Sequence, residues 1–241
     1  MSQLQYLVLA THGETDKWKS LSTLTAQVRA AGTLWDLKGQ PGILENYTAT
    51  IDLHRQFASH SPFGEPDLRS FYTPERVAVE TLDGDVLEER INPRAAFAGH
   101  TLQTPWDRLH AAYFTGYAMW NYLTEPFTFT HPGFSFAELD PWHEDGETWR
   151  RLQVTFPDSV HTHSRVQTYY IDRDGLIRRH DYFADVLGPA DLPSAHYSSG
   201  HQHFDGFVFP TQRRVHLTDA SGHKLPEPVI VAIDLDHITL G

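Results

Sequence analysis

The chain has 241 residues, with 31 Asp and Glu against 19 Lys and Arg, a formal net charge of −12 and no cysteine. The lack of cysteine excludes disulfides, thiolate nucleophiles and cysteine-ligated metal sites. The acidic excess disfavours nucleic acids and anionic membrane surfaces as partners, since both select for basic proteins.

The N-terminal segment MSQLQYLVLATHGETDK differs from a signal peptide. Its apolar run covers only residues 6–10, and no basic residue precedes it. A signal peptide carries a basic segment followed by a longer apolar core. We therefore expect a cytoplasmic protein with no membrane insertion.

The first third of the chain predicts one helix followed by strands. Residues 16–31 carry an apolar stripe at helical spacing, so we expect an N-terminal amphipathic helix there. Extended segments are expected at residues 33–38 and 47–55, the second because its apolar residues alternate with polar ones. The dipeptide Asp83-Gly84 lies between RVAVETL and VLEERI and predicts a tight hairpin turn.

The stretch WDRLHAAYFTGYAMWNYL, residues 106–123, predicts a buried helix. We expect Thr104 to be its N-cap and Pro105 its first residue, which is a common pattern at helix starts. Pro126 should end the helix, because the residue before a proline disfavours helical geometry. Aromatic residues occur on almost every side, and a helix that is apolar all round lies in a protein interior.

The rest of the chain predicts mostly strands. They are expected at residues 127–130, 147–156, 165–172, 176–185, 195–205, 206–218 and 229–235. Most of them connect to their sequence neighbours through short turns such as DRDG, so we expect a single α+β domain over residues 1–241. Its sheet would be large, curved and antiparallel, an incomplete β-barrel wrapped around the buried aromatic-rich helix.

The order of these elements resembles a known superfamily. An N-terminal amphipathic helix, a strand beginning TLWDLKG, hairpins, an embedded helix and a long meander are similar to the lipoprotein-carrier (LolA-type) superfamily. The resemblance implies an incomplete β-barrel that helices close over an apolar cavity. Separately, FAGHTLQTPWDRLHAAYFTGYAMWNYLTEPF and RRHDY are similar to bacterial proteins of unknown function, which implies no activity.

One strand places a charged residue on an apolar face. In FVFPTQRRVHL, Arg213 shares a face with Phe209 and Val215. A guanidinium buried among apolar neighbours is unfavourable unless it has a partner. Arg213 would therefore anchor a carboxylate or similar acceptor of a ligand, form an ion pair with an internal acid such as Asp181, or turn outward at a bulge near Pro210.

A second strand, GLIRRHDYF, carries a row of chemically useful side chains. Arg178, His180 and Tyr182 share one face if the strand is regular. His180 could act as a general acid or base, Tyr182 as a hydrogen-bond donor and Arg178 as the group that stabilises negative charge. The alternative is a solvated face with cross-strand ion pairs.

The chain contains 16 histidines, and two His-x-His pairs stand out among them. The pairs are His161 with His163 and His201 with His203. On a strand this spacing directs both imidazoles to one side, and His180 or His196 could be a third ligand for a metal ion that activates water. Loop histidines that bind nothing are commoner, so we expect no metal ion and no cofactor.

These features predict a cavity between helix and sheet that binds a lipophilic or aromatic small molecule. The residues expected to contact this ligand are Arg213, His196, His203, Tyr113, Tyr117 and Trp120. The alternatives are an enzyme that uses the same cavity with His180 as acid or base, including metal-dependent hydrolysis, and a partner-binding protein with a filled core. No motif of a serine hydrolase, P-loop or Rossmann fold is present in the sequence, and the oligomeric state is not predicted.

Overall fold

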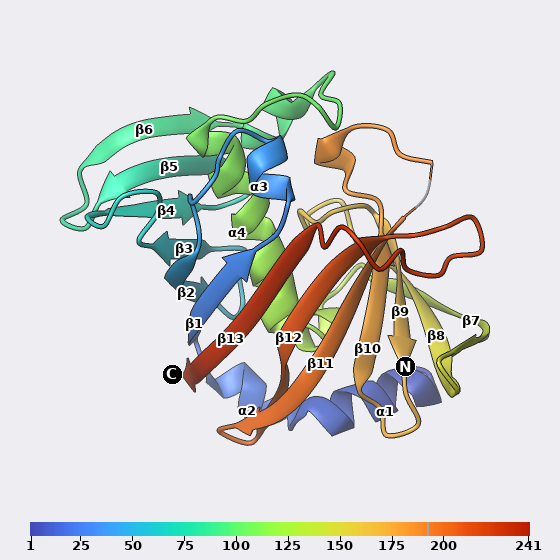
Figure 1. The fold of residues 1–241 in the computed structure, drawn as a ribbon. Coiled ribbons are helices and arrows are strands. Elements are labelled where there is room, and N and C mark those ends of the chain that lie inside the picture. Colours follow the sequence, from blue (N-terminus) through green and yellow to red (C-terminus); the bar gives the residue numbers. More distant parts are fainter. Residues whose placement is uncertain (192) are drawn as a thin grey trace.

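The computed structural model describes residues 1–191 and 193–241. Within them, thirteen strands form one open sheet (Figure 1). The strands are β1 (Thr23–Ala31), β2 (Asn46–Asp52), β3 (Ala58–Ser61), β4 (Leu68–Tyr72), β5 (Arg76–Thr81), β6 (Val86–Ile91), β7 (Ser135–Glu144), β8 (Glu147–Thr155), β9 (Val166–Ile171), β10 (Ile177–Tyr182), β11 (Ser194–Phe204), β12 (Phe207–Leu217) and β13 (Val231–Leu240).

The sheet is built from two meanders that meet in its centre. The strand order is β6-β5-β4-β3-β2-β1-β13-β12-β11-β10-β9-β8-β7. The first and last strands, β1 and β13, pair antiparallel with each other in the centre. On each side of this pair, every strand lies next to its neighbour in the sequence. The predicted large antiparallel sheet is therefore confirmed, and it stays open because β6 and β7 form its two edges.

The helices lie at one end of the sheet and across it. They are α1 (Gln3–His12), α2 (Thr15–Ser20), α3 (Leu34–Leu37) and α4 (Arg108–Thr124), with 3-10 turns η1 (Pro93–Phe97), η2 (Phe127–Thr130) and η3 (Asp185–Leu187). In the view of Figure 1, α4 passes behind the central strands, and α1 and α2 lie along the lower ends of β10 to β12. Leu4 and Val8 of α1 are buried in a cluster with residues of β8 and β9.

Helix α4 is buried along its length, as its sequence predicts. Every residue from 109 to 124 is buried. The helix ends at the C-cap Glu125, directly before Pro126, also as predicted. Its N-cap is Asp107 and not Thr104, because the Asp107 carboxylate accepts a 2.8 Å hydrogen bond from the amide of His110 and so satisfies a free N–H of the first turn.

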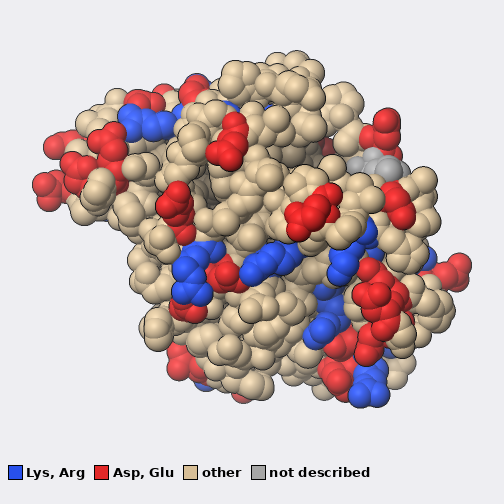
Figure 2. Space-filling view, in the orientation of Figure 1, with Lys and Arg blue, Asp and Glu red and all other residues tan. Residues whose placement is uncertain are grey.

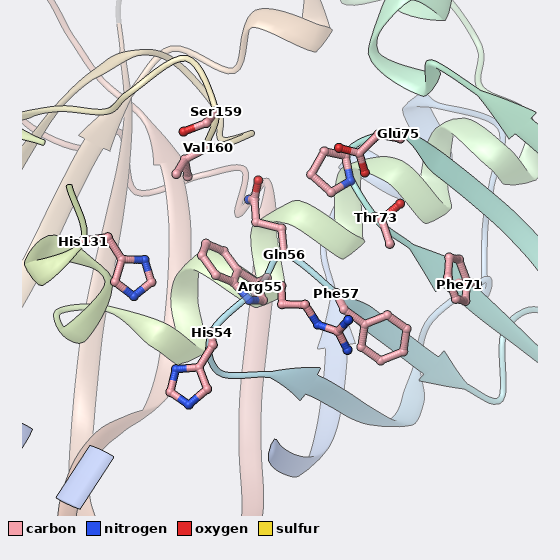
Figure 3. Close-up of a pocket in the computed structure, with 12 residues that line it drawn as sticks. His54, Arg55, Gln56, Phe57, Phe71, Thr73, Glu75, His131, Ser159 and Val160 are labelled. Carbon is pink, nitrogen blue, oxygen red and sulfur yellow. The ribbon is translucent and has the colours of Figure 1, made fainter. Parts of the chain in front are cut away.

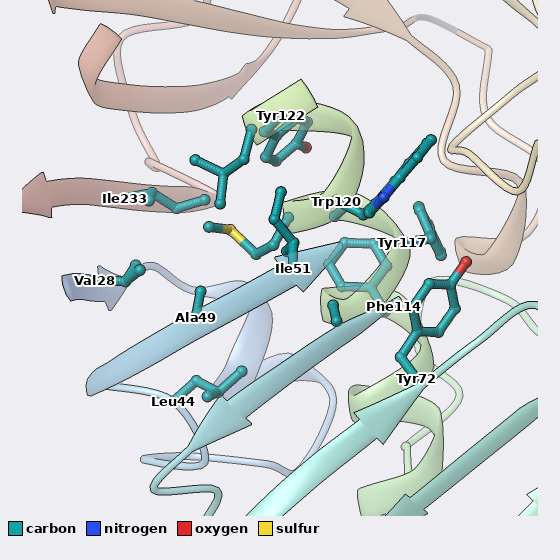
Figure 4. Packing of buried hydrophobic residues seen from close by; sticks show 14 of the residues in the cluster. Val28, Leu44, Ala49, Ile51, Tyr72, Phe114, Tyr117, Trp120, Tyr122 and Ile233 are labelled. Carbon is teal, nitrogen blue, oxygen red and sulfur yellow. The ribbon is translucent and has the colours of Figure 1, made fainter. Parts of the chain in front are cut away.

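The packing around α4 draws on both meanders. Val28, Ile51 and Tyr72 of the first meander and Ile233 of the second belong to one buried cluster with the aromatic residues of α4 (Figure 4). Sheet and helix approach closely at Gly116, where an added Cβ would lie 2.3 Å from the ring of Tyr72. The absence of a side chain at this position lets β4 approach the helix backbone.

Three predicted elements are wrong. Residues 16–31 form α2 and strand β1, since Leu24, Ala26 and Val28 alternate inward and β1 pairs on both sides. The apolar spacing of this stretch fits the period of a helix and also that of a strand. Pairing with β2 and β13 makes it a strand. Residues 33–38 contain the short helix α3, and residues 127–130 form η2.

Several elements were not anticipated by the sequence pattern. These are α1, β3, β4 and β7. The hairpin predicted at Asp83-Gly84 is confirmed, because β5 and β6 pair across it and Gly84 has a φ of 100°. The later strands lie within a few residues of their predicted bounds.

The surface carries charges of both signs. Among the described side chains on the face drawn in Figure 2, basic residues lie between acidic ones and form no single broad basic area. This agrees with the acidic balance of the sequence.

Among the described residues, no helix has the length and apolar character that crossing a membrane requires.

The contact at Gly116 gives a test of how tightly α4 packs. We expect Gly116→Ala to lower the free energy of unfolding by about 1–3 kcal/mol, because the new methyl group overlaps Tyr72 in a packed core. Urea denaturation measures this change. A loosely packed helix would instead gain about 1 kcal/mol from the better helix propensity of alanine, so a stabilised variant would contradict the packing.

A candidate ligand site between helix α4 and the sheet

The tyrosines of α4 make hydrogen bonds to the loop that joins β8 to β9. His161 Nδ1 lies 2.9 Å from the Tyr113 hydroxyl, and His163 lies 3.1 Å from the Tyr117 hydroxyl through Nδ1 and 2.7 Å from the Tyr122 hydroxyl through Nε2. A neutral imidazole donates one hydrogen bond and accepts one. One tyrosine therefore donates to His163 and the other accepts from it, and the loop is tied to the helix.

On the sheet side, aromatic and imidazole rings form a stacked layer. Tyr182 stacks on His163 with ring centroids 4.0 Å apart, and its hydroxyl lies 3.1 Å from that of Tyr122. His180 stacks on Tyr169 at 4.2 Å. His196 lies directly across from His180 on the neighbouring strand, with ring centroids 5.8 Å apart.

Burial keeps these imidazoles neutral. The desolvation of His163, together with the positive charge of Arg94, lowers its pKa to about 3. The pKa values of His180 and His196 lie well below the ordinary value, first because of burial and then because Arg213 and neighbouring imidazoles disfavour a further positive charge. The interior thus contains hydrogen-bonding rings that carry no charge at neutral pH.

Arg213 places a buried positive charge in this interior. Its side chain is 5% exposed, and its Nη2 donates a 2.7 Å hydrogen bond to the backbone carbonyl of Tyr122. That carbonyl would be paired with the residue four positions later in a continuing helix, but this residue is Pro126, which has no N–H. Arg213 also lies over the Tyr122 ring, 5.0 Å from its centroid, and contacts the Ser198 hydroxyl at 3.5 Å.

The acid that interacts with Arg213 is Glu125. Burial raises its pKa to about 7, while a 2.6 Å hydrogen bond from the Tyr169 hydroxyl and the charge of Arg213 oppose this rise. Glu125 forms no ion pair with Arg213 among the contacts of the described residues. Burial thus favours the uncharged form of Glu125 and opposes its role as a counter-charge to Arg213.

Several buried nitrogens near Arg213 have no partner. Within the described part of the chain, no protein group bonds to the Arg213 Nε, to either ring nitrogen of His196 or to the His180 Nδ1. Buried polar atoms are almost always paired in folded proteins, with protein, water or a ligand. These nitrogens are polar atoms that the described fold leaves unsatisfied.

A cleft opens beside this interior. Its volume is about 570 Å³, and Figure 3 shows His54 and His131 on one side, Thr73 and Glu75 on the other and Val160 above. The residues that line it are His54, Arg55, Gln56, Phe57, Phe71, Thr73, Pro74, Glu75, Trp120, His131, Ser159 and Val160. Trp120 of α4 contributes to the wall and donates its indole N–H to the carbonyl of Asp52 at 2.8 Å. The cleft thus combines aromatic surface with polar groups.

The loop of residues 157–165 separates the cleft from a second, smaller one. The second cleft has a volume of about 180 Å³ and includes Arg94 and His161, and Val160 lines both. Gln56 holds the loop in place, because its amide oxygen accepts from the His161 N–H and its amide nitrogen donates to the His161 carbonyl, both at 2.7 Å. Asn121 donates a further bond to the same carbonyl at 2.9 Å.

Most of the predicted site residues lie in this region. The following predicted residues are buried on α4 or on the strands that face it: His180, Tyr182, His196, Arg213, Tyr113, Tyr117 and Trp120. Asp181, considered as a partner of Arg213, instead pairs with Arg179 at 2.7 Å. The positions of Arg213 and His180 relative to each other follow from the strand register, which the sequence alone does not fix.

Two predicted site residues lie elsewhere. The Arg178 side chain is 36% exposed and lies 3.9 Å from Asp172, because β10 has an irregular register against β9 at this point and Arg178 is the extra residue. His203 is exposed near the turn between β11 and β12. Gly200, with a φ of 63°, interrupts regular strand geometry between His196 and His203. The row of Arg178, His180 and Tyr182 is therefore incomplete.

The metal alternative has no geometric support in the described residues, where no three His, Asp or Glu side chains are placed to hold a metal ion. His161 and His163 lie in a loop, and each faces a tyrosine. His201 contacts the backbone carbonyl of Ile177 at 3.2 Å.

Sequence reasoning did not identify Gln56, Glu125 or Arg94 as parts of this region. Gln56 and Arg94 belong to segments with no regular pattern, and they reach the site only through the fold. Glu125 gave a signal, since an acid between an apolar helix and a proline is buried with the helix end. In the structure, Glu125 is 8% exposed.

Comparisons with known proteins find distant structural similarities only. No protein-family profile matches the sequence, and no curated protein matches it. A LolA superfamily protein from Nitrosomonas europaea is 11% identical with a TM-score of 0.48, covering 99% of this chain and 93% of that chain. A DUF1329 family protein from Desulfovibrio piger is 12% identical with a TM-score of 0.49, covering 98% and 90%.

A third structure, described as an outer membrane lipoprotein-sorting protein domain from Vibrio parahaemolyticus, is 9% identical with a TM-score of 0.49, covering 93% of this chain and 89% of that chain. At such identities and TM-scores these similarities say nothing of a site or a ligand in this chain.

The buried imidazoles predict acid sensitivity. The pKa of His163 is about 3 in the folded protein, against 6.5 for a histidine side chain that is free in water, so the unfolded chain binds a proton first as pH falls. Its contribution to stability is complete above pH 6.5 and is lost as pH falls from there toward 3.

We expect His163→Asn to reduce the loss of stability between pH 7 and pH 5 by up to about 1.4 kcal/mol per pH unit, which is the effect of one proton. Urea denaturation at several pH values measures it. An equal pH dependence in the wild type and the variant would show that His163 is not held neutral by the fold.

Proposed function

We propose that this protein binds a lipophilic or aromatic small molecule between α4 and the sheet, which curves around the helix as an incomplete barrel. The single observation that carries this proposal is the cleft of about 570 Å³, which is lined by Trp120 of α4 and by part of the loop of residues 157–165. Pockets for small molecules are concave and mostly apolar, with a few polar groups that fix orientation.

The lining of the cleft supports an aromatic or lipophilic ligand. Phe57 and Phe71 contact each other edge to face at 5.4 Å, and each is only half-buried. Val160 adds an apolar side chain from the loop. Together with Trp120 they offer apolar surface at one side, whereas His54, Arg55 and His131 offer donors and acceptors at the rim.

The catalytic alternative gains no support from this geometry. His180 and Tyr182 are 2% and 4% exposed, and neither lines any of the clefts described above. A general acid or base has to come within hydrogen-bond distance of its substrate. Binding therefore remains the function that the arrangement favours.

The cleft can be tested with the neutral aromatic probe N-phenyl-1-naphthylamine, whose fluorescence rises in apolar surroundings. We expect the wild type to bind it and Phe57→Ser to bind it at least about tenfold more weakly, because aromatic contact area is lost. Phe183→Ser is the matched control, since Phe183 is 40% exposed and lies outside the cleft lining. Equal affinities of the wild type and Phe57→Ser, or no binding to the wild type, would contradict the proposal.

The loop of residues 157–165 should control access to the interior behind it. We expect Gln56→Ala to remove both hydrogen bonds to the His161 backbone and to speed hydrogen exchange of the His161 amide by at least about fivefold. Gln202→Ala, at an exposed position of β11, serves as the control. Unchanged exchange in Gln56→Ala would show that other contacts hold the loop.

A further inference from the structure

The cleft of about 570 Å³ is lined by an acid that no described side chain neutralises. Glu75 lies in the turn between β4 and β5, is exposed, and stands beside Thr73 on one wall of the cleft (Figure 3). The ion pairs formed by three arginines of this region, in the described part of the chain, do not include it. Their partners are Asp52 for Arg55, Glu80 and Glu89 for Arg76, and Asp185 for Arg94. The Glu75 carboxylate can therefore pair with a positive charge that enters the cleft.

The negative charge of Glu75 reaches the loop that forms another wall of the cleft. Burial and then the charge of Arg94 lower the pKa of His161, and the charge of Glu75 opposes this change. His161 directly follows Ser159 and Val160, which both line the cleft. The carboxylate thus lies within electrostatic range of the space between the turn and the loop.

The positive charge in the lining is already balanced. Arg55 donates from Nε to the Asp52 carboxylate at 2.7 Å, and its side chain is 80% exposed. The same carboxylate accepts from the amides of His54 and Arg55 at 2.9 and 3.1 Å, which fixes it beside the guanidinium. Arg55 and Asp52 together carry no net charge, so Glu75 gives this group of residues a negative balance.

The histidine at the far wall adds no positive charge at neutral pH. His131 lines the cleft opposite Glu75 (Figure 3). Burial and then the nearby charge of His54 lower the pKa of His131. The neutral imidazole offers a hydrogen-bond acceptor, which also suits a ligand that carries N–H donors.

The apolar side chains of the cleft suit a cation with an apolar body. Phe57 and Phe71 are half-buried and contact each other edge to face at 5.4 Å. The faces of aromatic rings attract cations, and the guanidinium of Arg76 already lies 4.8 Å from the centroid of the Phe71 ring. The net charge of −12 also favours the approach of cations over that of anions.

We propose that the cleft binds an amphipathic amine, whose ammonium group pairs with Glu75 and whose apolar part lies against Phe57 and Phe71. This inference rests on the proposed function and adds the charge of the ligand and its orientation. An ammonium group donates up to three hydrogen bonds, and the Glu75 carboxylate and the Thr73 hydroxyl both accept. The competing account makes Glu75 a solvated surface residue beside a cleft that selects for apolar area alone.

The test compares 1-naphthylmethylamine, 1-naphthalenemethanol and 1-naphthylacetate, which share one ring system and carry a positive, no and a negative charge. Isothermal titration calorimetry of the full chain at about pH 7.5, where the amine is protonated and the acid ionised, measures the affinities. We expect the amine to bind about fivefold more tightly than the alcohol, through ion pairing and cation–π attraction, and the acetate to bind most weakly. An amine that binds no more tightly than the alcohol, or than the acetate, would overturn the inference.

Variants then locate the charge. Glu75→Gln should lower the affinity for the amine to that for the alcohol and leave the alcohol unchanged. Glu45→Gln is the matched control, because Glu45 is also exposed and lies outside the cleft lining. Glu75→Lys should reverse the order, so that the acetate binds more tightly than the amine. A preference for the amine that persists in Glu75→Gln, or that is lost equally in Glu45→Gln, would overturn the inference.

The two proposals fail in different ways. Equal binding of the amine and the alcohol would leave the proposed small-molecule function standing and remove only the amine site. Absence of binding of all three compounds, together with no binding of N-phenyl-1-naphthylamine, would remove both.

Discussion

The structure depends on how the end of a fully buried helix satisfies its last carbonyls. A helix leaves its final C=O groups without partners, and water cannot reach those of α4. The Tyr122 carbonyl has no partner on the chain that follows, because Pro126 has no N–H to donate to it. Arg213, from a strand far away in the sequence, donates to this carbonyl instead.

This interaction brings a positive charge into the core and decides what can lie around it. A cation is favourable at the negative end of a helix, but the guanidinium still lacks an ion-pair partner among the described residues. Burial keeps the neighbouring imidazoles neutral, and the charge of Arg213 adds to this effect, while burial raises the pKa of Glu125 to about 7.

The loop of residues 157–165 completes the arrangement from the other side. It satisfies tyrosine hydroxyls of α4 with His161 and His163 and is itself fixed by Gln56. The stacking of His163 on Tyr182 and the packing of Val160 against the core add to these bonds, so the loop is part of the packed interior.

The sequence predicts the parts of this structure that local patterns encode. The buried nature of α4, its end at Pro126 and the later strands follow from periodicity and from the chemistry of proline. The first third of the chain was harder, because the apolar spacing in β1 fits a helix as well as a strand and only pairing with β13 settles it. The predicted site residues Arg178 and His203 also depart from the local pattern. An irregular strand register turns Arg178 outward, and Gly200, with its positive φ, interrupts the strand before His203.

Local sequence patterns do not predict the contacts between distant segments. Nothing in the residues around Gln56 indicates a bond to the backbone of His161, which is 105 positions away. Likewise, the pairing of Arg213 with the Tyr122 carbonyl needs the sheet to place β12 beside the end of α4. These contacts define the candidate site, and they exist only once both meanders are in place.

The most direct test is the free energy of unfolding of Arg213→Met, measured by urea denaturation beside Arg214→Met as the control. We predict a loss of about 1–3 kcal/mol in Arg213→Met only, because the buried Tyr122 carbonyl is left without a donor. An Arg213→Met variant that is as stable as the wild type would contradict the central role of this interaction.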